Sequence, residues 1–110
     1  MAQIITREDQ STVISNLDTY NHTAQSTSMY VVSASLTEIP PSSVSIVIKQ
    51  NGSTKATSDA PSATQSAIKL RTILNVTSGD TLTIVISSTD PAESGANIIK
   101  GIVSFRPGTV

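Results

Sequence analysis

The sequence predicts an all-β protein, a single antiparallel β-sandwich or jelly roll. Its 110 residues include thirteen Ile, nine Val and fifteen Thr, and these β-branched side chains pack well on a pleated surface. Three stretches alternate apolar and polar residues with a period of two, which is the periodicity of a strand. Turn residues separate the stretches, and short strands at intervals of about 8 to 14 residues are typical of this class.

The first 27 residues are the least regular part of the chain. They combine a polar run, residues 7–10, with isolated apolar residues, which are Ile4, Ile5, Val13, Ile14 and Leu17. Two alternatives fit this pattern: an extended N-terminal arm that becomes ordered on a partner, or a first strand packed on the sandwich. Residues 28–110 then form the β-sandwich domain, and the chain length is that of one domain.

Five strands are expected after this segment, each with an apolar face. For four of them the expected inner-face residues are Tyr30, Val32, Ala34 and Leu36; Val44, Ile46 and Ile48; Ile68, Leu70, Leu74 and Val76; and Leu82, Ile84 and Ile86. In the last strand, residues 98–105, either face could be the inner one, because Ile98 and Ile102 compete with Ile99, Val103 and Phe105. Gly101 in this strand indicates a bulge or a close neighbour.

Turn residues lie between the expected strands. Asn51-Gly52 predicts a type I′ hairpin, because both residues accept a positive φ. A two-residue turn would pair Ile48 with Lys55, which does not suit a buried face, so a bulge or a three-residue loop stays an alternative. Residues 78–80, Ser-Gly-Asp, predict a tight link between two long strands.

The small net charge argues against polyanionic partners. Seven Lys and Arg stand against eight Asp and Glu, a formal net charge of −1 without blocks of one sign. Neither nucleic acid nor a membrane is therefore predicted as a partner. The absence of Cys excludes disulfides and thiolate sites. The chain shows neither a signal-peptide pattern nor an apolar run of spanning length, so synthesis in the cytoplasm is expected.

The residues that commonly perform catalysis are sparse, and no enzymatic activity is predicted. His22 is the single histidine and has no carboxylate within three residues, so it is expected to be a solvated loop residue without a base partner. Asp90 and Glu93 share a loop but lack the oxygen spacing of a calcium site. The five glycines are never grouped into a phosphate-binding loop. No catalytic residue, metal or cofactor is therefore expected.

Some strands are apolar on both faces. Val47, Ile73 and Val85 lie opposite the Ile and Leu faces of their own strands, although a sheet of an isolated sandwich needs one dry face. These three residues predict an interface between identical subunits. The alternative is that they are scattered surface residues, which are common in monomers.

Three segments carry a resemblance to a known class of proteins. Residues 41–52 (PSSVSIVIKQNG), 78–88 (SGDTLTIVISS) and 97–104 (NIIKGIVS) resemble small accessory proteins of tailed-phage virions, which are compact β-sandwich or jelly-roll proteins. The Gly79-Asp80 strand start also resembles that of trimeric jelly rolls of the C1q and tumour-necrosis-factor type, although the aromatic-rich core of those families is missing. The similarity covers about Val44 to Ser104.

This resemblance implies a decoration (cement) protein, a homotrimer on the capsid surface of the virion that binds the major capsid protein and stabilises the assembled head. The N-terminal apolar residues Ile4, Ile5, Val13, Ile14 and Leu17 would then face the capsid, by adding a strand to a sheet edge or by filling a groove. One alternative is a receptor- or glycan-binding module of a fibre or tail that uses the loops at residues 58–66 and 90–96. Another is a ring-forming tail-tube or baseplate component.

Overall fold

The computed structural model describes residues 3–6, 8, 11–16, 18–38, 44–58, 68–88 and 98–107 of the chain. Over these residues the backbone forms nine strands and no helix. In chain order the strands are β1 (Gln3–Ile4), β2 (Thr12–Asn16), β3 (Thr19–Thr23), β4 (Ser28–Glu38), β5 (Val44–Gln50), β6 (Ser53–Thr57), β7 (Ile68–Val76), β8 (Thr81–Ser88) and β9 (Ile98–Pro107). No helix long and apolar enough to cross a membrane is found in this part of the chain.

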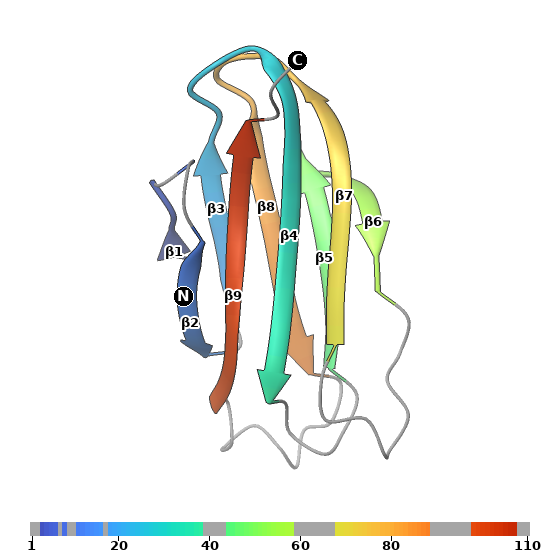
Figure 1. The fold of residues 1–110 in the computed structure, drawn as a ribbon. Coiled ribbons are helices and arrows are strands. Elements are labelled where there is room, and N and C mark those ends of the chain that lie inside the picture. The colour runs from blue at the N-terminus through green and yellow to red at the C-terminus, as the bar shows by residue number, and fades with distance from the viewer. Residues whose placement is uncertain are drawn as a thin grey trace.

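The strands form two sheets packed face to face (Figure 1). One sheet has the order β1-β3-β8-β5-β6, and the other has the order β2-β9-β4-β7. Strands pair from the middle of the chain outward, β5 with β6, β4 with β7, β3 with β8 and β2 with β9, all antiparallel. This nested pairing is the topology of a jelly roll, to which β1 adds a short parallel partner of β3. The predicted all-β antiparallel fold is confirmed.

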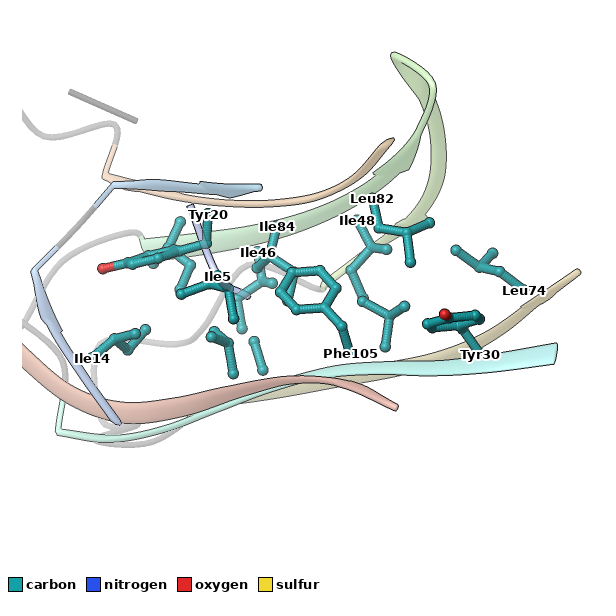
Figure 2. Close-up of a cluster of buried hydrophobic side chains, with 14 of the residues drawn as sticks. Ile5, Ile14, Tyr20, Tyr30, Ile46, Ile48, Leu74, Leu82, Ile84 and Phe105 are labelled. Atoms are coloured by element: carbon teal, nitrogen blue, oxygen red, sulfur yellow. The ribbon is translucent and has the colours of Figure 1, made fainter. Parts of the chain in front are cut away.

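The core lies between the sheets and contains the inner-face residues that the alternation predicts (Figure 2). The predicted inner faces of β4, β5 and β8 are fully buried, and that of β7 is buried or half-buried. The structure also decides between the two faces of β9. Gly101, Val103 and Phe105 point inward, whereas Ile102 points outward and is 41% exposed.

The N-terminal segment is divided between the two sheets. β1 lies at the edge of the five-stranded sheet and β2 at the edge of the four-stranded sheet, so the chain crosses from one to the other between them. Ile5 and Ile14 point into the core and are buried. Their expected role as capsid-facing residues is therefore wrong, because a buried side chain is not available to a partner of the folded protein. Ile4 and Val13 are exposed, and Leu17 lies outside the described residues.

The β5–β6 hairpin has the predicted turn and a bulge. Asn51 and Gly52 have φ values of 52° and 84°, as a type I′ turn requires. The register then shifts after Lys49, which pairs with Thr54, so that Ile48 pairs with Ala56. Lys55 is the extra residue of this bulge and stays exposed, while the half-buried Ala56 packs against the core. The bulge thus removes the Ile48–Lys55 mismatch that a regular hairpin would create.

Replacing Gly101 with alanine is expected to lower the free energy of unfolding by about 1–3 kcal/mol, because β4 and β9 leave no space for a Cβ atom. A Cβ added at Gly101 would lie 2.6 Å from both the carbonyl oxygen of Ser35 and Cδ2 of Leu36. The leucine side chain can rotate, but the carbonyl belongs to the sheet backbone. Urea unfolding measures the loss, with the exposed Thr57→Ala as the control. A Gly101→Ala protein as stable as the wild type would contradict the close approach of these strands.

Candidate functional site

His22 occupies a different environment from the one expected. It lies in β3 and is 2% exposed, so the prediction of a solvated loop histidine is wrong. Its ring stacks with that of Phe105, with a centroid distance of 5.2 Å. Nδ1 faces the backbone carbonyl of Ile5, and Nε2 lies 2.7 Å from Oε2 of Glu8. Both ring nitrogens are therefore engaged in holding the N-terminal segment against β3.

The Glu8 carboxylate, which is half-buried, is the centre of this cluster. Its Oε2 accepts hydrogen bonds from the Tyr30 hydroxyl at 2.6 Å and from the Gln25 amide at 3.0 Å, in addition to that from His22. Burial of the carboxylate acts to raise its pKa, but the hydrogen bonds from Tyr30, His22 and Gln25 outweigh it, so the pKa of Glu8 is lowered. Because Oε2 serves three donors, the cluster favours a charged carboxylate with a structural role.

A second polar cluster closes the end of the sandwich at the β7–β8 turn. Asp80 accepts hydrogen bonds from the backbone amide of Thr77 and from the side chains of Gln50 and Asn51. The Thr77 hydrogen bond is the main cause of the lowered pKa of Asp80, followed by those from Asn51 and Gln50. Among the described residues no group of three or more metal-binding side chains is present. Asp90 and Glu93 lie outside them.

The structure does not bring the three predicted interface residues together. Val47 and Val85 are paired neighbours on β5 and β8, half-buried on the outer face of the five-stranded sheet. Ile73 lies on β7, in the other sheet, and is 55% exposed. A subunit contact that uses all three would have to involve both outer faces of the sandwich.

Exposed apolar side chains gather instead on the outer face of the four-stranded sheet, the face toward the viewer in Figure 1. Five large apolar residues of the described chain are exposed, and four of them lie here: Val13, Met29, Ile73 and Ile102. Val13 and Ile102 are paired neighbours on β2 and β9 and line a hollow of about 420 Å³. We refer to this surface as the four-stranded outer face. These residues form two apolar groups, Val13 with Ile102 and Ile73 with Met29, separated by the polar row of Arg71, Ser33 and Ser104. Exposed apolar groups of this kind, with polar residues around them, are typical of an interaction site.

Cations lie on the same face, between the apolar residues. β7 contributes two exposed cations and β9 another two, which together are Lys69, Arg71, Lys100 and Arg106. They are four of the seven Lys and Arg of the chain. The acidic side chains that the structure describes lie elsewhere, in the interior cluster, before β3 and in the β7–β8 turn: Glu8, Asp18 and Asp80. The fold therefore brings cations of β7 and β9, which are about thirty residues apart in the sequence, onto one surface.

The loops proposed for glycan recognition are almost entirely outside the described residues. Of residues 58–66 and 90–96, the structure describes Ser58 alone. Its hydroxyl accepts a hydrogen bond from the Ile46 amide, and its own amide donates to the Ile46 carbonyl, so it closes the β5–β6 pair. Glycan recognition by these loops stays a prediction.

Comparison with known proteins identifies a fold and no family. No family model and no curated protein matches the chain. Among solved structures, it is similar to the pre-peptidase C-terminal domain of a collagenase from Bacillus anthracis, with 14% identity and a TM-score of 0.58 over 96% of this chain and 94% of that domain. A β-glucosidase from Paenibacillus barengoltzii gives 20% identity and a TM-score of 0.54 over 96% of this chain. The chain spans 11% of that glucosidase. At these identities the likeness shows the β-domain fold alone.

Proposed function

We propose that this protein is a virion structural protein, a decoration (cement) protein that binds the assembled head of a phage as a homotrimer. The observation that carries the proposal is the four-stranded outer face, where four of the five exposed large apolar residues lie among four cations. A surface that combines apolar residues with Arg suits contact with another protein. Jelly rolls are frequent in viral capsids, which supports the proposal by analogy of fold.

The proposed activity needs no chemical step. A protein that binds only the assembled shell stabilises it by RT ln(1 + [L]/Kd), which is about 4 kcal/mol per site at a thousandfold excess over Kd. The four-stranded outer face would contact the major capsid protein, and Val47 and Val85 on the opposite face would contact other copies of the chain. Ile4, exposed at the β1 edge, would add contact by strand pairing with the shell.

Replacing Val13 and Ile102 together with threonine is expected to abolish binding to shells while the domain stays folded. Both side chains are exposed and paired, so the change removes apolar contact area and keeps β-branched residues in the strands. The free energy of unfolding should change by less than about 0.5 kcal/mol per site. Co-sedimentation with empty phage heads measures binding, and Thr54→Ser with Thr57→Ser, exposed on β6, is the control. Undiminished binding by the double variant would refute this contact surface.

Absolute mass, measured by light scattering behind a sizing column, tests the oligomeric part of the proposal. If the wild-type protein is a homotrimer and the double variant Val47→Thr with Val85→Thr is a monomer, self-association through the five-stranded sheet would be supported. A monomer at all concentrations would refute the trimer. Binding to shells would then be tested for a monomeric decoration protein.

A further inference from the structure

A second hollow of about 450 Å³ lies on the four-stranded outer face, beside the Val13–Ile102 pair. Two arginines and three serines line it: Arg71, Arg106, Ser11, Ser33 and Ser104. The strand register produces this grouping. Arg71 on β7 pairs with Ser33 on β4, which pairs with Ser104 on β9, and Arg106 lies two residues further along β9. Residues from three strands thus converge on one concave site.

The polar groups of this hollow are suited to an oxyanion. The hydroxyls of Ser33 and Ser104 lie 2.7 Å apart, and a bond between them uses the proton of only one, so one O–H stays available to a ligand. Ser104 is only 7% exposed, which fixes this pair in place. Neither Arg71 nor Arg106 forms an ion pair with another described side chain. Two guanidinium groups and a hydroxyl donor offer the forked geometry that carboxylate, sulfate and phosphate groups accept.

We propose that this hollow binds a carboxylate of a partner protein, and that the four-stranded outer face docks an acidic, partly apolar segment of that partner. The carboxylate is favoured over a nucleic-acid phosphate because no aromatic side chain for base stacking lies on this face within the described residues. It is favoured over a sulfated sugar because Ile73, Val31 and Ile102 lie between the cations and suit the side chains of a polypeptide. That the partner is a capsid protein rests on the proposed function; the anion site does not.

The spacing of the cations matches an extended acidic segment. Arg106, Arg71 and Lys69 occupy three successive rows of paired residues, those of Val31, Ser33 and Ser35 on β4. Successive rows on one face of a sheet are about 6.8 Å apart. An extended peptide with Glu at every second position presents carboxylates at the same interval, so each row can meet one carboxylate.

A synthetic peptide tests the site without any virion component. The probe is the heptapeptide Thr-Glu-Thr-Glu-Thr-Glu-Thr, its control carries Gln in place of Glu, and binding is measured by NMR titration at low salt. The glutamate peptide is expected to shift the amides of Ser33, Arg71 and Arg106, and Arg71→Gln with Arg106→Gln to weaken binding about tenfold or more. Lys49→Gln with Lys55→Gln removes the same charge from the five-stranded sheet and should leave binding within about twofold.

The other outcomes of these binding experiments distinguish the anion site from the proposed decoration function. Equal weakening by the two double variants would overturn the site, because net charge alone would then explain binding. Binding of a heparin-derived oligosaccharide but not of the glutamate peptide would overturn the polypeptide ligand. If the wild-type protein binds the glutamate peptide but does not bind empty phage heads, the site would be supported and the decoration role refuted. If the double variant Arg71→Gln with Arg106→Gln binds empty heads as tightly as the wild type does, docking through this face would be overturned.

Discussion

Replacing Phe105 with alanine is expected to lower the free energy of unfolding by about 3–5 kcal/mol, the largest effect of any single substitution proposed for this chain. Phe105 is the only phenylalanine, and its side chain is fully buried between the sheets (Figure 2). The ring also stacks on His22, so its removal leaves both a cavity and an imidazole without its packing partner. A domain of this size has a total stability of only about 5–15 kcal/mol, so the variant would be marginally folded.

Two companion variants identify the cause of that loss. Phe105→Leu keeps most of the apolar volume and should recover more than half of the stability that alanine loses. Ile102→Ala changes a residue three positions earlier on β9 that points outward, and its effect should stay within about 0.5 kcal/mol. Chemical denaturation measures all three. If Phe105→Ala and Ile102→Ala cost the same, the assignment of the inner face of β9 would be refuted.

The alternation of apolar residues was sufficient to predict most of the core because it is a local property. β4, β5 and β8 each bury one face of the period-two pattern, and that face can be read directly from the strand's own residues. β9 was ambiguous for the same reason, since Ile102 and Val103 are equally apolar neighbours. Gly101 shows which face of β9 is the inner one only when its neighbour β4 is known, because the absence of a Cβ at Gly101 leaves room for Leu36 of β4.

The four-stranded outer face could not be predicted, because its residues come from strands that are distant in sequence. The outward positions of β7 were visible in the alternation, with Lys69, Arg71 and Ile73 on one face. β4 lies between β7 and β9 in the sheet, so the neighbours of these residues on β9 are known only when both pairings of β4 are known. In the chain, β4 comes about forty residues before β7 and about seventy before β9. Nothing local marks Arg106 as a neighbour of Arg71. The same limit explains why Val47 and Ile73 were grouped although they lie in different sheets.

The His22 cluster could not be predicted from local sequence, because the carboxylate that bonds to the histidine is distant along the chain. Glu8 is fourteen residues away and comes from the segment between β1 and β2. β1 runs parallel to β3, which brings the residues that follow Ile4 alongside His22. A parallel pairing of a two-residue strand has no signal in the sequence. One residue of the polar run at residues 7–10 nevertheless contributes to the folded domain: Glu8 supplies the carboxylate that bonds to His22 and Tyr30.

Replacing Glu8 with alanine is expected to lower the free energy of unfolding by about 3 kcal/mol, because three donors around Oε2 lose their shared acceptor. The His22 ring is the most affected, since it is buried and has no second acceptor at Nε2 among the described residues. Glu8→Gln keeps an acceptor oxygen of the same reach and should cost less. Tyr30→Phe keeps the ring but removes the donor to Oε2 and the hydroxyl oxygen that accepts hydrogen bonds from the Gln25 and Ser26 amides, so its cost should be about 1–2 kcal/mol.

The Glu8 carboxylate also makes the free energy of unfolding depend on pH. The pKa of Glu8 in the folded protein lies below its ordinary value of 4.5, so the unfolded chain takes up the proton first as the pH falls. The contribution of Glu8 is therefore fully present above about pH 5 and is lost as the pH falls through the folded-state value. Glu8→Gln cannot titrate, and the gap in unfolding free energy between it and the wild type should narrow on acidification. Asp80, whose pKa is also lowered, is common to both proteins and cancels in this difference. A gap that stays constant from about pH 7 to about pH 2 would mean that the Glu8 carboxylate carries no more hydrogen bonding in the folded protein than in the unfolded chain.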